Sequence, residues 1–244
     1  MLIKIDNKPI SLQEIDSWRY RRIKNALSLL KEKKYIASNV DDAIATLTEV
    51  KKALGSEEII RRLRFTLAFN TLAIKIFAKL SKGKRKFAIV EVMADGISAE
   101  RVSYWVNKIN LNEQFDEQYT SVNLHACPDH YVLRCTEEKS LEVVECNGNF
   151  PTPFQFYIKY GDETGLNAKR DESFPYQSVG AARTKDGIVI GGVRHQFKDT
   201  DTGFMARLCV EFPSCTPSFV VKSHRIHMAA EFSYWLQWII DNKS

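Results

Sequence analysis

The hydrophobic pattern of the chain changes at Phe87, and this change constrains the fold more than any other feature. Before Phe87, apolar residues recur at intervals of three and four, the period of an amphipathic helix. After it, short β-branched or alternating runs separated by turn residues predict strands. These runs are KFAIVEVM at residues 86–93 and residues 119–124, 130–136, 141–147, 153–160, 176–183, 187–197 and 204–212. We therefore expect a helical unit over residues 1–86 and a sheet-containing unit over residues 87–244.

The first unit should begin with a short strand or hairpin and continue with three helices. Ser11 and Glu14 have the spacing of a capping box, which marks a helix start. Gly55 suits the left-handed position after a second helix, and Ser56 would cap a third helix ending near residue 80. The most apolar window, residues 65–80, is too short to span a membrane and contains Asn70 and Lys75. We expect it to form a buried helix.

In the second unit, the element order predicts an α+β fold with a long terminal helix. Ser98 opens an amphipathic helix, the predicted strands follow, and a last helix runs from Ser218 or Ser223 to Asp241. This is the order of a helix-grip (START or Bet v1-like) domain, in which a curved antiparallel sheet wraps a C-terminal helix. Such domains enclose a pocket between helix and sheet. A β-sandwich with a packed helix would give a similar pattern.

Charge is distributed unevenly between the two units. Residues 1–86 contain 20 Lys and Arg against 9 Asp and Glu, whereas residues 87–244 contain 15 against 21. The basic unit is consistent with three roles, namely nucleic-acid binding, docking of a protein partner, or homo-oligomerisation through its helices. Its basic residues include Arg19, Arg21, Arg22, Lys24, Lys31, Lys33, Lys34, Arg61, Arg62 and Arg64. Because no nucleic-acid motif accompanies them, we favour solvated helix faces over a nucleic-acid surface.

The cysteines indicate a reducing compartment. There are five, an odd number, without CxxC spacing, and the first ten residues do not resemble a signal peptide. We expect free thiols in a cytoplasmic protein.

The terminal helix contains the residues that most suggest chemistry. In SHRIHMAAEFSYW, His224, His227 and Glu231 stand at positions i, i+3 and i+7, so they share one helix face. That face borders the apolar stripe containing Met228 and Phe232. A polar pair at the edge of a core needs a partner. An exposed ion pair between His227 and Glu231 is the simpler alternative.

Two other segments offer such partners. In HACPDHY, residues 125–131, Pro128 cannot continue a sheet ladder, so a kinked strand entry would aim His125 or His130 inward. In LEVVECNGN, alternation places Glu145 on one side of a strand with Val143 and Asn147. Two imidazoles and two carboxylates suit Zn²⁺, and also Mn²⁺ or Fe²⁺. An open zinc position could hold water that attacks a carbonyl. Taken singly, each of these residues is more commonly an ordinary hydrogen-bonded or solvent-facing side chain.

The order of these motifs resembles the phloretin hydrolase and diacetylphloroglucinol hydrolase family. The resemblance covers residues 97–240 and rests on HxxPDH at 125–130, the Glu145 strand, the run from His195 to Pro213, and His227-x-x-x-Glu231. It implies a helix-grip fold and a zinc ion held by His130 (or His125), Glu145, His227 and Glu231. It also implies cleavage of the carbon–carbon bond between an acyl group and a phenolic ring. The link from His130 to Glu145 is shorter than in that family, and residues 1–86 have no counterpart there.

Such a reaction needs a proton donor near the ring and hydrogen-bond donors to the phenolic oxygens. His195 is the candidate proton donor, and Tyr131, Tyr157 or Tyr176 are candidates for binding the phenol. The alternative for His195 is a strand-end residue paired with Asp199. The main rival to a metal-dependent hydrolase is a metal-free helix-grip pocket for a small aromatic or apolar molecule.

Overall fold

The computed structural model describes residues 1–33, 37–111 and 116–242. Lys34, one of the basic residues named above, lies outside these ranges. The described chain forms an α+β structure with five helices and a curved nine-stranded antiparallel sheet. The helices are α1 (Leu12–Leu30), α2 (Val40–Ser81), α3 (Ala99–Leu111), α4 (Glu117–Ala126) and α5 (Ser218–Asp241). The strands are β1 (Leu2–Ile5), β2 (Lys8–Ile10), β3 (Arg85–Asp95), β4 (His130–Cys135), β5 (Leu141–Glu145), β6 (Phe154–Tyr160), β7 (Tyr176–Arg183), β8 (Val189–Asp199) and β9 (Gly203–Pro213).

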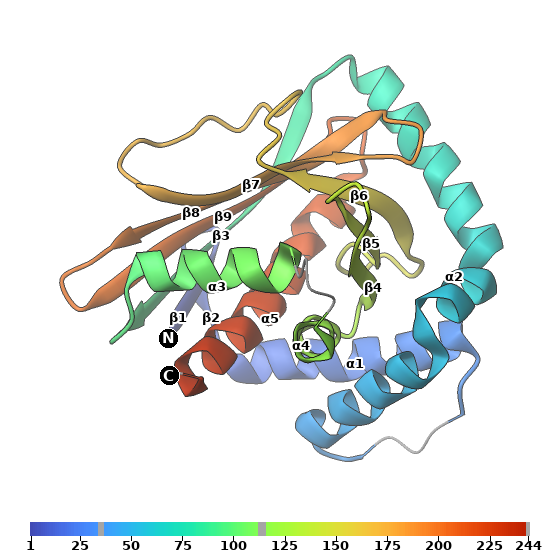
Figure 1. The fold of residues 1–244 in the computed structure, drawn as a ribbon, viewed down its shortest axis with the longest axis horizontal. Helices are drawn as coiled ribbons and strands as arrows, with labels where there is room; N and C mark the ends of the chain where they lie inside the picture. Colours follow the sequence, from blue (N-terminus) through green and yellow to red (C-terminus); the bar gives the residue numbers. More distant parts are fainter. Residues whose placement is uncertain (34–36, 112–115, 243–244) are drawn as a thin grey trace.

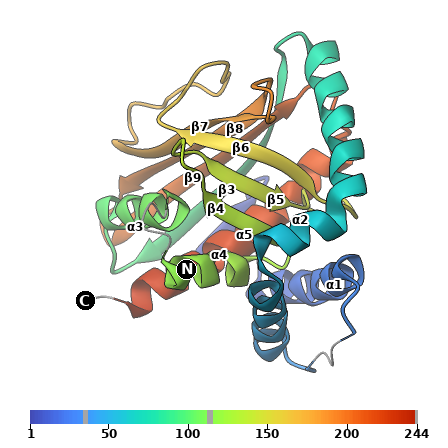
Figure 2. The ribbon, with the colours of Figure 1, turned by 45° about the vertical axis from the view of Figure 1, so that its right-hand side comes forward.

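The strands follow the spatial order β2-β1-β3-β9-β8-β7-β6-β5-β4. From β4 to β9 this is a meander, in which each strand pairs with the next along the chain. The sheet curves around α5, which crosses its inner side (Figures 1 and 2). The apolar side of α5, including Met228, Phe232 and Trp235, packs with inward residues of β3, β8 and β9 and with α3 and α4. This core fixes where α5 lies relative to the strands.

The first 86 residues do not form a body separate from the sheet. β1 and β2 form a hairpin whose turn, Asp6 and Asn7, has positive φ at both positions. β1 pairs in turn with β3, and the boundary predicted after residue 86 falls inside β3. Two helices, α1 and α2, then pack on each other and on the outward side of β4 and β5, where Tyr131 and Val144 are buried.

Local signals explain the helix boundaries. Ser11 and Glu14 form the predicted capping box of α1. Gly55 interrupts α2 with φ 71° and ψ 161°, values that essentially only glycine adopts, which confirms the predicted break. The last helix begins at Ser218, the earlier of its two predicted starts.

One predicted strand is wrong. Residues 119–124 lie in α4, whose first turn is capped by the Asp116 side chain accepting from the Gln118 amide. The buried residues Tyr119, Val122 and Ala126 follow helical spacing and face the core beside α3 and α5. The short apolar run was compatible with both periods, and packing against α3 and α5 selected the helix.

Within the described ranges, none of the helices combines the length and apolar character needed to cross a bilayer.

Candidate metal centre

His130 is positioned by the turn that joins α4 to β4. Pro128 lies in this turn, which is closed by a bond from the His130 amide to the Cys127 carbonyl, 3.1 Å. The His130 side chain is fully buried, and its Nδ1 lies 2.7 Å from the backbone carbonyl of Asn123. Because a carbonyl can only accept, Nδ1 carries the proton and Nε2 presents a lone pair. Backbone bonds of this kind orient histidines that bind metals.

His227 on α5 meets His130 across the interior. The two Nε2 atoms are 3.1 Å apart, and His227 is also buried. The backbone of Cys146 hydrogen-bonds to the His227 ring, and the indole of Trp18 contacts it edge-on, with ring centroids 6.2 Å apart. His227 is therefore held from the strand side and from α1.

Two carboxylates complete the arrangement. Glu145 ends β5 directly opposite His130 in the β4–β5 register, and its Oε2 lies 3.8 Å from Nε2 of both His130 and His227. Glu231, one helical turn after His227, places Oε1 3.6 Å from the His130 Nε2. His130, Glu145, His227 and Glu231, here called the four-residue cluster, therefore converge from β4, β5 and α5.

Burial sets the protonation of the cluster in the absence of a cation. Burial lowers the pKa of His227 to about 3. It also lowers the pKa of His130 well below its usual value, and the neighbouring His227 lowers the pKa of His130 further. Burial raises the pKa of Glu145 to about 8 and that of Glu231 well above its ordinary value. Ionising both carboxyl groups thus requires a compensating positive charge. A divalent cation supplies that charge in full.

The spacing of the ligating atoms also fits one ion. Four ligands about 2.0–2.2 Å from a tetrahedral zinc lie about 3.3–3.6 Å from one another. The measured separations, 3.1 Å between the imidazoles and 3.6–3.8 Å from imidazole to carboxylate, bracket that value. The donor set is the nitrogen and oxygen mixture that zinc, manganese and iron accept. The residues present therefore fit a divalent metal.

Two neighbours extend the set of candidate ligands. Cys127 Sγ lies 3.7 Å from Nδ1 of His227, but burial raises its thiol pKa well above the usual range, so the sulfur keeps its proton and is a weak ligand. His224 stacks on His227 with ring centroids 4.8 Å apart, and one of its ring nitrogens lies within 4.8 Å of ligand atoms on Glu145 and His227. Sequence spacing placed His224 on the shared helix face without giving it a role.

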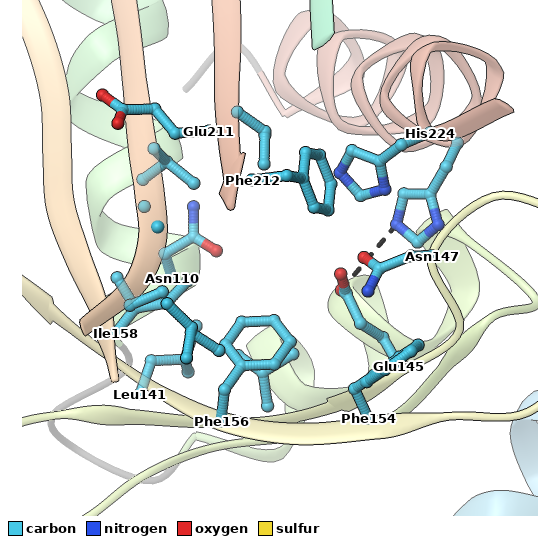
Figure 3. Close-up of a pocket in the computed structure, with 18 of the residues that line it drawn as sticks. Asn110, Leu141, Glu145, Asn147, Phe154, Phe156, Ile158, Glu211, Phe212 and His224 are labelled. Carbon is cyan, nitrogen blue, oxygen red and sulfur yellow. Dashed lines mark ion pairs between the residues drawn. The ribbon is translucent and has the colours of Figure 1, made fainter. Parts of the chain in front are cut away.

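A pocket lies beside the cluster, between α5 and strands β5 to β9. Glu145, Asn147 and His224 occupy one side of it, while Leu141, Phe156 and Ile158 lie across from them (Figure 3). The space open to the centres of water-sized molecules is about 90 Å³, several times what one water needs. Most of the wall is apolar or aromatic, and the described lining residues include no Lys or Arg. The wall thus combines a mainly apolar surface with the carboxyl groups of Glu145, Glu211 and Glu231.

The structure distinguishes between the two candidate histidines of HACPDHY. His125 lies in α4, where its ring stacks on Tyr234 with centroids 4.5 Å apart, and it does not belong to the four-residue cluster. Burial, with Arg19 nearby, lowers its pKa to about 4. The assignment of His125 as an alternative ligand is corrected, because the helix ends before the turn that brings His130 inward.

The candidate tyrosines do not reach the pocket. Tyr131 follows His130 on β4, so it points to the opposite face and packs among α1 and α2, with its hydroxyl 3.8 Å from Cys146 Sγ. Tyr157 faces away as well and donates to Glu142, 3.1 Å. Tyr176 packs at the margin of the α5 core. The prediction that Tyr131 and Tyr157 are catalytic residues is therefore corrected. Tyr160 lines the pocket and is the tyrosine that sequence reasoning missed.

His195 does line the pocket. The amide of Cys209 donates to its Nδ1, 3.3 Å, so the neutral ring carries its proton on Nε2. Burial lowers its pKa to about 3, which makes this ring a hydrogen-bond donor and not a cationic acid at neutral pH. Asp199 does not pair with it, because its carboxylate accepts from the Ala99 amide.

Basic residues of α1 and α2 hold the segment that carries His130. Arg22 binds both carboxylate oxygens of the buried Asp129, 2.7 and 2.9 Å, and donates to the Phe150 carbonyl. Lys51, fully buried on α2, donates to the Pro128 carbonyl, 3.0 Å. Arg19 donates to the Ala230 carbonyl of α5. These cations face inward, so they do not belong to a solvent-facing phosphate-binding surface.

Comparison with protein-family models and with curated proteins found no match. Among solved structures, the chain is similar to the crystal structure of protein Ms6760 from Mycobacterium smegmatis at 12% identity. That match covers 62% of this chain and 88% of the other, with a TM-score of 0.32, which is too low to carry an argument.

Proposed function

We propose that this protein is a metal-dependent hydrolase, with zinc as the expected ion, that cleaves a carbon–carbon bond in a small acyl-phenol. The proposal combines the resemblance to the phloretin hydrolase family with a helix-grip interpretation of the curved sheet around α5. The observations that support it are the 3.1 Å approach of the His130 and His227 Nε2 atoms, the Glu145 carboxylate 3.8 Å from both, and the Glu231 carboxylate 3.6 Å from His130.

The residues of the chain divide the work of such a site. His130, Glu145, His227 and Glu231 would hold the ion, and the Asn123 carbonyl keeps the His130 lone pair directed at it. A bound zinc ion supplies Lewis acidity, which polarises a carbonyl group and lowers the pKa of water. Aromatic side chains of the pocket wall, including Phe154, Phe156 and Trp235, exclude bulk water from the reacting bond.

Two donors on the pocket wall suit the phenolic oxygens. His195 presents its Nε2–H group, and Tyr160 presents a hydroxyl whose pKa is raised by burial beside Glu231 and Glu145, so it stays protonated. The absence of Lys and Arg from the described lining disfavours phosphate or carboxylate substrates. An uncharged acyl-phenol meets both conditions.

A metal-free pocket for an apolar ligand is the second candidate, and the largely apolar wall favours it. The two functions differ in what the cluster does, because a binding module has no use for ionised Glu145 and Glu231. Ligand binding that persists without metal and without turnover would support this second function.

The test is hydrolysis of a panel of acyl-phenols, followed by chromatography of the released carboxylic acid and phenol. We expect turnover by the zinc-loaded protein. In Glu231→Gln the turnover rate should fall by at least about a hundredfold, which is the size of loss that removing one metal or transition-state contact causes. Tyr157→Phe, which alters an outward residue, is the matched control and should retain turnover. A metal-loaded protein that leaves the whole panel intact would contradict the proposal.

A further inference from the structure

The outer face of α2 carries a row of bulky apolar side chains in water. Beyond the break at Gly55, the exposed residues are Phe65, Phe69, Leu72, Ile76 and Leu80, here called the α2 stripe. Their exposed fractions run from 47% to 75%. The sequence predicted a buried helix for residues 65–80, but only the opposite face, with Leu67, Asn70 and Ile74, is buried. Contiguous apolar surface of this kind marks an interaction site.

The spacing of the stripe indicates what kind of surface covers it. Its members follow one another at intervals of four, three, four and four residues. Intervals of four and three are those of the a and d positions of a coiled coil, a seam that packs against one other helix. The stripe extends along 16 residues, about 24 Å of helix. A single partner helix of the same length matches it.

The charges flanking the stripe identify the partner and its direction. Residues 59–90 contain no Asp or Glu, while Glu57 and Glu58 stand before the stripe and Lys82 and Lys84 after it. An antiparallel second copy of α2 sets Glu57 and Glu58 of each helix near Lys82 and Lys84 of the other. A parallel copy would place Lys79, on the same face as the stripe, opposite itself. Of the two directions, the antiparallel one therefore keeps the two Lys79 side chains apart and brings lysines near glutamates.

Intramolecular ion pairs reduce the remaining repulsion. Arg61 and Arg62 would approach the Lys79 and Lys82 end of an antiparallel copy, but both already pair with Glu58, at 2.6 and 2.8 Å. Arg62 also pairs with Glu32 at 2.7 Å. The arginine end of the helix thus presents little net positive charge to a second copy.

We propose that the protein forms a two-fold symmetric dimer in which the α2 stripes of two copies pack antiparallel. Phe65 then packs on Ile76 of the second copy, and Phe69 on its Leu72, in the a-to-d layers of an antiparallel coiled coil. Phe65 and Phe69 each offer roughly 150–250 Å² of side-chain surface, about three quarters of it exposed. Two stripes together would bury roughly 1,000 Å², about the minimum expected of a biological interface.

Sedimentation velocity on the full chain tests the dimer. We expect a mass of twice 28.0 kDa at micromolar concentration, and the mass of one copy for Phe69→Glu. Tyr104→Glu, at an aromatic residue of α3 that is also exposed, is the matched control and should stay dimeric. Because both positions face solvent, each variant should keep the wild-type circular dichroism spectrum. A monomeric wild type, or a dimer indifferent to Phe69→Glu, overturns the proposal.

Cysteine cross-linking tests the direction of packing. In a Cys215→Ser background, which removes the exposed native thiol, the variant Phe65→Cys with Ile76→Cys should oxidise to a covalent dimer. Phe65→Cys alone should remain uncross-linked, since antiparallel packing keeps the two copies of residue 65 apart. Cross-linking of the single variant would overturn the antiparallel arrangement. A monomer that binds anionic vesicles through the stripe would assign it to a lipid surface instead and equally overturn the dimer.

Discussion

At the scale of single residues, the candidate metal centre depends on groups outside the four-residue cluster, among them Asp129, whose Oδ2 lies 3.9 Å from Nδ1 of His227. Asp129 follows Pro128 in the turn before His130 and is fully buried. Its carboxylate is neutralised by Arg22 of α1, more than a hundred residues away in the sequence. Even so, burial raises the pKa of Asp129 to about 7, against the lowering effect of Arg22 and Lys51. The orientation of His130 thus depends on a cation supplied by the N-terminal helices.

Arg22→Met should destabilise the protein strongly. The change leaves the Asp129 carboxyl group buried without its ion-pair partner, which typically costs about 3–5 kcal/mol of the free energy of unfolding. Chemical denaturation measures this loss. Arg21→Met is the control, because Arg21 is exposed on the same helix and should change the stability by less than about 0.5 kcal/mol. Equal stabilities for the two variants would contradict the structural role assigned to Arg22.

The burial of Lys51 predicts how the stability of the protein depends on pH. Burial lowers its pKa from 10.5 to about 8, so between these values the unfolded chain binds more protons than the folded one. The free energy of unfolding should therefore rise with pH across this window, by up to about 1.4 kcal/mol per pH unit from this group. Chemical denaturation at pH 8 to 10.5 gives the free energy of unfolding of the wild type and of Lys51→Met. If the two free energies change with pH in the same way, Lys51 does not have a buried, destabilised ammonium group.

At the scale of elements, the break in α2 lets one long segment serve two surfaces. The part before Gly55 packs on α1 beside β4 and β5, and the part after it passes beside β6 (Figure 2). Residues adjacent to the break are helical on both sides. The direction of the second part, and with it the exposure of the α2 stripe, depends on the dihedral angles of Gly55.

Gly55→Ala distinguishes this break from an ordinary helical position. Alanine in a regular helix would stabilise the protein by about 1 kcal/mol, but at φ 71° and ψ 161° it should destabilise by about 1–3 kcal/mol. No atom lies within 4 Å of the added Cβ, so the effect is conformational and not steric. Thermal denaturation gives the sign, with Ser56→Ala as the neighbouring control. A stabilised Gly55→Ala variant would show that the helix runs straight.

At the scale of the whole molecule, sequence patterns predicted local elements better than side-chain directions. Helical spacing placed His227 and Glu231 on one face, and strand alternation placed Glu145 with Val143, and the structure agrees with both. The same alternation should have excluded Tyr131, because adjacent strand residues face opposite ways once His130 points inward. Arg22 and Lys51 could not be assigned from the sequence, since their partners are set by how α1 and α2 pack on the sheet.

The central claim is that the four-residue cluster binds a divalent metal, and metal analysis of the purified full chain tests it most directly. We predict one equivalent of zinc, manganese or iron per chain, lost in His227→Ala and retained in His125→Ala, whose ring lies outside the cluster. The melting temperature should fall on chelation in the wild type and not in His227→Ala. A wild-type protein that takes up no stoichiometric metal when zinc is supplied, with a melting temperature indifferent to chelator, would contradict the account.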